Sequence, residues 1–134
     1  MGDFFIYRFE KLEVYQLARK FRVEIKKLTL SFPSDEKFEL TSQIRRSSSS
    51  IATNLAEGSG RASPNDQAHF TNISYSSALE TVDHLIYARD MDYIDEQVYN
   101  SLRKKLDEII NKVNSLYKYQ INQTENLKTK LKKP

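Results

Sequence analysis

Apolar side chains recur at steps of three and four residues through most of this chain, and that spacing limits it to an all-α fold. The clearest stripes are Phe9-Leu12-Tyr15-Ala18-Phe21-Ile25-Leu28, Leu40-Ile44-Ser48-Ile51-Leu55 and Leu102-Leu106-Ile109-Val113-Leu116. Opposite the first stripe lies a cationic face, which comprises Arg19, Lys20, Arg22, Lys26 and Lys27. This division into an apolar and a charged face is typical of helices that pack on one side and meet water on the other.

Glycine and proline, three of each, mark where the helices stop. Pro33 ends the first helix, because the residue before a proline avoids the α region. The second helix begins between Ser34 and Thr41, both of which are suitable N-caps. Gly58 is predicted to end it as a left-handed residue beyond the last turn.

The third helix has the most definite start. Ser63 can cap it, Pro64 suits the first helical position, and Asp66 favours the positive end of the helix dipole. Two apolar stripes follow, one through Phe70 and Ile73, the other through Tyr75, Leu79, Val82 and Ile86. A face this broad predicts contact with more than one helix.

Four amphipathic helices with short connections predict an antiparallel up-and-down four-helix bundle. We assign the bundle to residues 1–121 and expect residues 122–134 to form a disordered, basic polar tail. The chain opens with no charged-then-apolar leader and contains no membrane span, so we expect a cytoplasmic protein.

The net charge of +3 is unevenly distributed: residues 1–100 carry −3 and residues 101–134 carry +6. A basic end on a slightly acidic body indicates an anionic partner, with nucleic acid as the first candidate. A solvated basic helix face is the alternative, and the charge count by itself favours it.

Residue sets that could run an enzyme reaction are lacking in the sequence. Cysteine is absent, and the two histidines, His69 and His84, stand 15 positions apart on the third helix, roughly 22 Å along its axis. The segment 58–61, Gly-Ser-Gly-Arg, could hold a phosphate, but a helix stop is the commoner role. Ribonucleases on four-helix scaffolds have four to six residues between arginine and histidine, whereas seven residues separate Arg61 from His69. We therefore predict a protein without catalytic activity, metal or cofactor.

Several segments carry a family resemblance. Residues 43–46 (QIRR), 50–58 (SIATNLAEG) and 60–63 (GRAS) closely resemble the signature of the four-helix bundle proteins encoded in intervening sequences of 23S ribosomal RNA genes. The resemblance continues through residues 9–16, 77–80 and 88–94 and spans about residues 8–118. Ser47 and Ser76 depart from the usual alanine and glycine, and both are exchanges of one small residue for another.

The resemblance implies a left-handed antiparallel bundle that assembles into a ring, typically a pentamer. A related branch of the family serves reverse transcriptases of diversity-generating retroelements as an accessory protein that binds nucleic acid and the polymerase. These properties are expectations for the present chain.

Polar residues on the second and third helices, Asn54, Glu57 and Glu80, are interpreted as an interior hydrogen-bond network, the alternative being a functional site. We expect Glu80 to be buried and bonded to Asn54 or to an arginine of the second helix.

The function predicted from these observations is that of a non-enzymatic, oligomeric accessory factor that contacts the phosphate backbone of RNA or DNA. The candidate contacts are Arg45, Arg46, Arg61, Arg103, Lys104 and Lys105. The expected partners are further copies of the chain, nucleic acid and a protein such as a reverse transcriptase, without a membrane. A protein-binding scaffold with no nucleic-acid role is the alternative, favoured by the acidic first 100 residues and by the lack of an evident basic groove.

Overall fold

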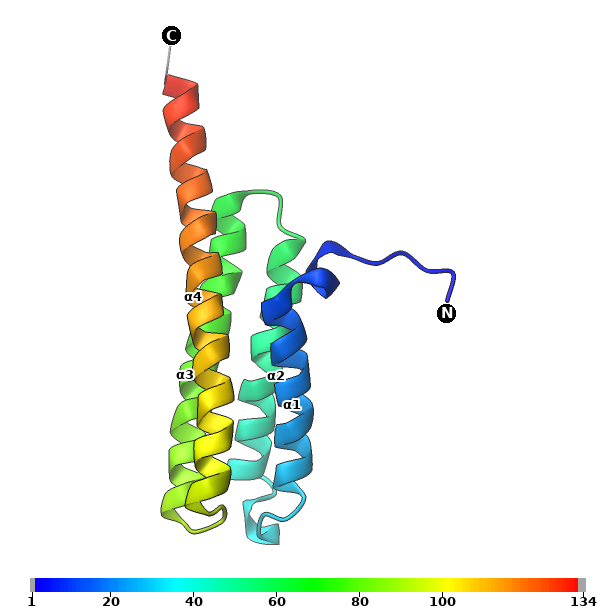
Figure 1. The fold of residues 1–134 in the computed structure, drawn as a ribbon, viewed down its shortest axis with the longest axis vertical. Helices are drawn as coiled ribbons and strands as arrows, with labels where there is room; N and C mark the ends of the chain where they lie inside the picture. Colours follow the sequence, from blue (N-terminus) through cyan, green and yellow to red (C-terminus); the bar gives the residue numbers. More distant parts are fainter. Residues whose placement is uncertain (1, 133–134) are drawn as a thin grey trace.

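The computed structural model describes the backbone of residues 2–132 and the side chains of residues 2–123. This part of the chain forms four α-helices: α1 (Glu13–Thr29), α2 (Leu40–Ser59), α3 (Pro64–Asp90) and α4 (Glu96–Lys132). Short 3₁₀ helices, Arg8–Lys11 and Ser34–Glu36, precede α1 and α2. Successive helices run in opposite directions along one elongated bundle (Figure 1). The predicted all-α four-helix bundle is confirmed, while its handedness stays a prediction.

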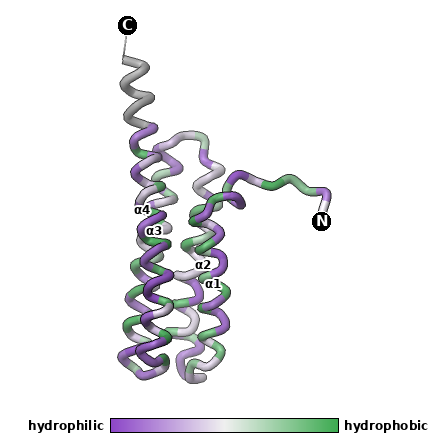
Figure 2. The backbone as a smooth tube through the Cα atoms, viewed as in Figure 1, coloured by the Kyte–Doolittle hydropathy of each residue, from purple (hydrophilic) through white to green (hydrophobic). Residues whose placement is uncertain are grey.

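The core is built from the predicted stripes of α1, α2 and α4. All five stripe residues of α2 are buried, as are Leu102, Leu106, Ile109 and Val113 of α4. Hydrophobic and hydrophilic residues are interspersed along the helices, as Figure 2 shows. The hydrophobic effect on these faces therefore holds the helices together.

The core face of α3 differs from the one predicted. Its buried residues are mostly small: Ala68, Thr71, Ser74, Ser77, Ala78, Thr81, Leu85 and Ala88. Leu79, which the sequence places on an apolar stripe, is 46% exposed. Helix α3 does contact both α2 and α4, as its broad apolar face predicts. The small residues of α3 let its axis come close to the neighbouring helices. The larger apolar residues of α3 therefore lie at the sides of these helix contacts and do not fill them.

Hydroxyl groups join α2 to α3 inside the bundle. The Thr81 hydroxyl donates to Ser47 Oγ at 2.8 Å, and Ser74 Oγ donates to the Ile51 carbonyl oxygen at 2.8 Å. The serine-rich segment of α2 is a poor helix former by itself, because serine competes for backbone hydrogen bonds. Here Ser47 and Ser50 contact hydroxyls of α3, and the Ser48 hydroxyl donates to the Arg45 carbonyl oxygen of its own helix, so these side chains support the helix instead of competing with it.

Gly58 has a packing role, and the prediction that it ends α2 in the left-handed conformation is wrong. Helix α2 continues to Ser59, and no glycine with a positive φ occurs among the described residues. A Cβ atom on Gly58 would lie 2.9 Å from the Cβ of Phe70. Glycine is needed because α3 passes too closely for a side chain.

The helix starts agree with the sequence at α3 and differ at α2. Ser63 Oγ accepts a hydrogen bond from the Asp66 amide at 3.1 Å, which confirms the predicted cap. Helix α2 begins at Leu40, inside the predicted interval from Ser34 to Thr41, but neither of these two residues caps it. A side chain in the preceding turn, Glu36, accepts from the Leu40 amide at 3.4 Å instead.

The sequence places the end of the bundle at residue 121, whereas the backbone of α4 is helical to Lys132. The lysine side chains of the predicted tail lie outside the described residues, so the tail and its boundary stay predictions.

Candidate nucleic-acid interface

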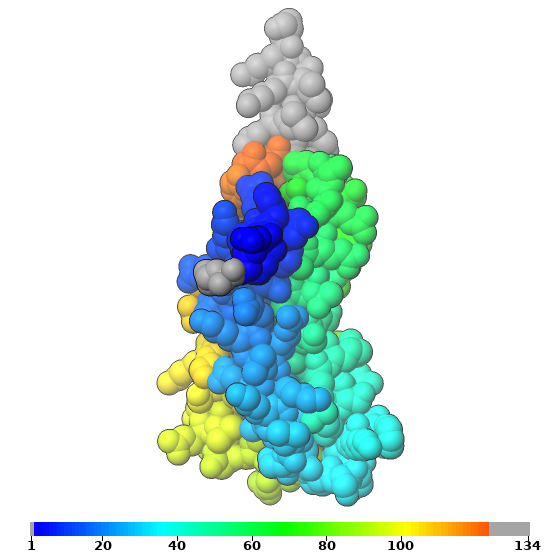
Figure 3. Space-filling model, turned by 90° about the vertical axis from the view of Figure 1, so that its right-hand side faces the viewer, coloured from blue at the N-terminus to red at the C-terminus, as the bar shows by residue number. Residues whose placement is uncertain are grey.

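A basic groove lies between α1 and α2. It is lined by Arg22, Val23, Lys26, Lys27, Arg45 and Ser49, and its volume is about 380 Å³. Four of these six residues are cationic and none is acidic. Figure 3 shows the face of the molecule on which α1 lies beside α2, with α4 on the other side of α1.

The cations of the groove come from two helices. Arg22 and Lys26 are four residues apart and so share one face of α1, while Arg45 extends from α2. The Arg45 Nε donates to Thr29 Oγ1 at 2.7 Å, and the Thr29 hydroxyl donates to the Lys26 carbonyl oxygen at 2.9 Å. A neutral hydroxyl therefore positions the guanidinium, and no carboxylate among residues 2–123 forms an ion pair with Arg45.

The sequence prediction includes Arg45 but misses the rest of this groove. The prediction that an evident basic groove is lacking is wrong for this face. The cationic face of the first helix supplies Arg22, Lys26 and Lys27. In the sequence this face is like any helix face exposed to water, and only the packing of α2 against α1 places Arg45 beside it. The sequence does contain a signal of this groove. It is the spacing of Arg19, Arg22 and Lys26, which places these three cations along one face of the helix.

Two candidate arginines meet carboxylates next to α3. Arg46 forms an ion pair with Glu80 and also donates to the Gln43 side chain. Arg61 Nη2 lies 3.6 Å from Glu57 Oε1, and its guanidinium lies 4.3 Å from the centre of the Phe70 ring. Their charges are thus compensated within the molecule.

The three candidates of α4 differ among themselves. Arg103 donates to Asp107 at 3.2 Å and to the Tyr99 hydroxyl at 2.7 Å, and these two bonds raise the pKa of its guanidinium. Lys105 donates to Glu24 of α1 at 2.6 Å. Lys104 is exposed and forms no ion pair with any described side chain.

The polar residues predicted as one interior network lie in separate places. The Asn54 amide donates to the Ser50 carbonyl oxygen at 2.9 Å and to Ser50 Oγ at 2.8 Å, and Ser50 Oγ lies 2.9 Å from Ser77 Oγ of α3. Asn54 therefore belongs to the interface between α2 and α3.

Glu57 and Glu80 belong to the surface. The Glu57 side chain is 53% exposed beside Arg61. Glu80 is bonded to an arginine of α2, as expected, but its side chain is 37% exposed, so the prediction that it is buried is wrong. A second neighbour of Glu80 is His84, whose Nε2 lies 3.1 Å away.

The two histidines have ordinary surroundings. His69 packs edge-on against the Phe70 ring, with 5.5 Å between ring centres.

No group of three or more His, Cys, Asp or Glu side chains among residues 2–123 could hold a metal ion. None of the helices, over their described residues, is long and apolar enough to cross a membrane.

Comparison with known proteins assigns the chain to a family. Residues 10–115 match the model of the 23S rRNA-intervening sequence protein family. A similar solved structure is that of a protein of unknown function from the S23 ribosomal protein family of Bacteroides thetaiotaomicron, with a TM-score of 0.73 and 29% sequence identity over 78% of this chain and 95% of that chain. No curated protein matches the sequence. The matched residues include all of α1, α2 and α3, and on this evidence the chain belongs to the 23S rRNA-intervening sequence protein family.

Proposed function

We propose that this protein is a non-enzymatic accessory factor that self-assembles and binds the phosphate backbone of RNA or DNA through the groove between α1 and α2. The observation that carries the proposal is the lining of that groove, with four cations and no carboxylate. Phosphate contacts supply most of the sequence-independent affinity of nucleic-acid-binding proteins. The compartment that fits such a partner is the cytoplasm.

The lining of the groove supports backbone contact rather than base reading. Arg22, Lys26, Lys27 and Arg45 are donors suited to phosphate oxygens, and no aromatic side chain lines the groove. Binding should therefore be tolerant of sequence. A ring of copies, typically five in the family, would present the groove repeatedly and raise the affinity for long nucleic acid.

A protein-binding scaffold is the second candidate function. The observation that favours it is a set of apolar side chains exposed outside the basic groove, among them Phe38 at 84% and Tyr87 at 44%. A polymerase such as a reverse transcriptase is the partner that the family resemblance suggests. Both functions can coexist, since these side chains do not line the basic groove.

The experiment that tests the nucleic-acid proposal is a binding titration with RNA and DNA at several salt concentrations. For the natural chain, the logarithm of affinity should fall linearly with the logarithm of salt concentration, because each neutralised phosphate releases counterions. Reversing Arg22 and Lys26 to glutamate should reduce the magnitude of that slope by about 2, one for each lost phosphate contact. The loss should be the same for all sequences.

A matched control carries the same charge change elsewhere. Lys37→Glu with Lys118→Glu alters two exposed lysines outside the groove and should leave the slope close to that of the natural chain. If the two double variants lost affinity equally, net charge rather than the groove would govern binding. If the natural chain bound no RNA or DNA at low salt, the scaffold function would replace this proposal.

A further inference from the structure

An apolar arm at the start of the chain extends away from the bundle (Figure 1). Its residues are Phe4, Phe5, Ile6 and Tyr7, and their exposed fractions are 69%, 74%, 43% and 59%. Four consecutive exposed apolar residues are unusual on a monomer, because they gain nothing from being in water. The arm is therefore a surface that needs a partner.

The arm is held in a defined direction. The Tyr7 amide donates to Glu10 Oε2 at 2.7 Å, which fixes the point where the arm meets the first 3₁₀ helix. Aromatic rings continue the connection: Phe5 lies edge-on to Tyr7 at 5.2 Å, and Tyr7 stacks on Phe9 at 6.3 Å. A directed arm loses less conformational entropy on binding than a free chain end.

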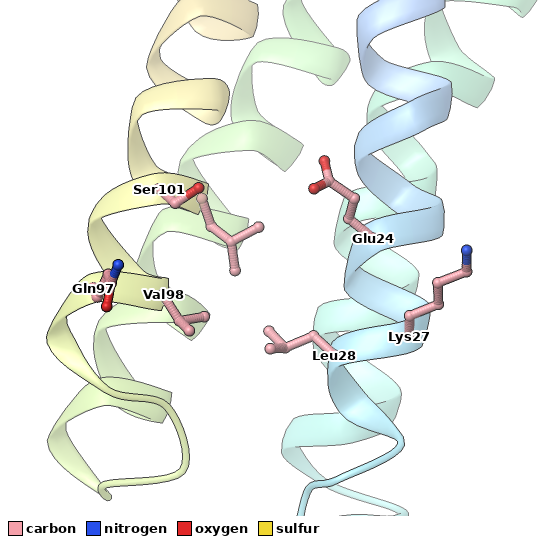
Figure 4. A pocket seen from close by; sticks show the side chains of 7 residues that line it. Glu24, Lys27, Leu28, Gln97, Val98 and Ser101 are labelled. Carbon is pink, nitrogen blue, oxygen red and sulfur yellow. The ribbon is translucent and has the colours of Figure 1, made fainter.

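A groove suited to such an arm lies at the far end of the bundle, between α1 and α4. It is a shallow groove, open to solvent, with a volume of about 610 Å³. Leu28 of α1 and Val98 of α4 point toward each other across it (Figure 4). Glu24 and Lys27 stand at its rim, and Lys27 forms no ion pair with a described side chain.

The arm cannot reach the groove of its own chain. Four extended residues span at most about 14 Å from Arg8. Leu28 lies 15 residues beyond Glu13, the first residue of α1, which is roughly 22 Å along the helix. Any arm that occupies this groove must therefore come from another molecule.

We propose that the arm of one copy binds in the groove between α1 and α4 of a second copy. Each copy then inserts its arm into one neighbour and accepts the arm of another neighbour in its groove. Such a head-to-tail contact between two different surfaces builds rings or filaments. This inference deepens the self-assembly part of the proposed function and is independent of nucleic-acid binding.

The size of the arm fits a contact that is repeated around an assembly of copies. Phe4, Phe5 and Tyr7 are about two-thirds exposed, so burying them removes about 300–500 Å² from water on the side of the arm. One contact then buries about 600–1,000 Å² in total, the size of a weak interface, and each copy in a ring makes two such contacts.

Two variants with complementary defects test the contact. Phe4→Ser with Phe5→Ser removes the apolar tip of the arm, while Val98→Glu places a charge in the groove. Val98 occupies the first turn of α4, three residues after its cap Asp95, where glutamate is favourable to the helix. Both variants should retain the helical circular dichroism and melting temperature of the natural chain.

Sedimentation equilibrium of the natural chain should give an assembly several times larger than 15.7 kDa, and each variant alone should give a monomer. An equimolar mixture of the two variants should give a dimer and nothing larger, because only one intact arm and one intact groove can meet. With oxidised glutathione as the oxidant, which is reduced to two thiols in the exchange, a disulfide should also form on mixing Phe4→Cys with Val98→Cys, and the natural chain has no other cysteine to compete.

Each contrary result has its own meaning. An arm variant that assembles like the natural chain would overturn the inference and leave self-assembly in place. Monomeric variants whose mixture stays monomeric would exclude this groove as the receiving surface. A natural chain that is monomeric at micromolar concentration would overturn self-assembly itself, while the salt titration of the basic groove would stand.

Discussion

Arg45 and Arg46 are neighbours in the sequence, but they meet opposite electrostatic surroundings. Arg45 is bonded to the neutral Thr29 hydroxyl, whereas Arg46 faces the Glu80 carboxylate. Adjacent helical residues are about 100° apart, so they extend toward different neighbouring helices. An incoming phosphate must displace a carboxylate from Arg46 but not from Arg45. This difference is why we assign the anion site to α1 and α2.

Tyr93 is the residue with the largest change in acidity. Its hydroxyl donates to Glu36 Oε2 at 2.8 Å, and this bond, followed by desolvation, raises the pKa of Tyr93 to about 12 from its ordinary value of 10.0. Glu36 is buried and also accepts from the Leu40 amide. The contact ties the connection between α1 and α2 to the turn before α4.

The raised pKa of Tyr93 predicts a loss of stability in alkaline solution. Because the folded-state pKa exceeds the unfolded one, the contribution of this phenol is complete below pH 10 and disappears as the pH rises from 10 to 12. Urea unfolding of the natural chain and of Tyr93→Phe should therefore give free energies that converge over this interval.

An optical titration provides an independent check of Tyr93. The natural chain should show a phenol that ionises near pH 12 and that is missing from the Tyr93→Phe variant. A constant difference in unfolding free energy between the two proteins from pH 8 to 12 would contradict the assigned hydrogen bond.

At the scale of the element, the closeness of α2 and α3 sets the architecture. Gly58 packs against the Phe70 Cβ, and hydroxyl pairs such as Thr81 with Ser47 replace larger apolar contacts. Interiors are close-packed, so an added methyl group must displace its neighbours. The contact at Gly58 involves a Cβ atom, which moves only with its helix.

Gly58→Ala should destabilise the protein. Overpacking costs about 1–3 kcal/mol, whereas alanine gains up to about 1 kcal/mol of helix propensity over glycine. We expect a net loss of about 1–2 kcal/mol in the free energy of unfolding. Gly60→Ala is the matched control: its Cβ would lie no closer than 3.5 Å to a neighbour, and its φ is −86°. That variant should be neutral or slightly more stable, and equal losses in both would refute the packing role.

The predictable part of the fold is the part that local patterns encode. The stripe of α2 and the cap at Ser63 depend on spacing within one helix, and both are confirmed. Gly58 was misassigned because a helix stop and a close crossing both require glycine. The basic groove was missed because Arg45 and Lys26 come together only when two helices pack. Sequence periodicity shows which residues share a face of one helix. It does not show which faces of two different helices lie side by side.

For the whole molecule, α1 is the element shared by both proposed surfaces. One of its sides contributes Arg22 and Lys26 to the basic groove, and the other contributes Glu24 and Leu28 to the groove that receives an arm. Lys27 lines both grooves, but Arg22, Lys26 and Arg45 line the first groove alone, so assembly through the second would leave these three cations open. Each added copy then brings another basic groove to the same particle, so assembly and nucleic-acid affinity are coupled through geometry alone.

This coupling predicts that removing the arm weakens binding to long nucleic acid without altering the basic groove. The Phe4→Ser, Phe5→Ser variant should bind an oligonucleotide that fills one groove as tightly as the natural chain does. On RNA long enough to cross several grooves, its affinity should fall by about 100-fold or more, because multivalent gains are of that order. Titrations of both lengths at one salt concentration measure the two values. An equal loss of affinity for the short and the long nucleic acid would mean that Phe4 or Phe5 contacts nucleic acid directly. A loss of avidity alone would weaken binding to the long molecule and leave the short one unchanged.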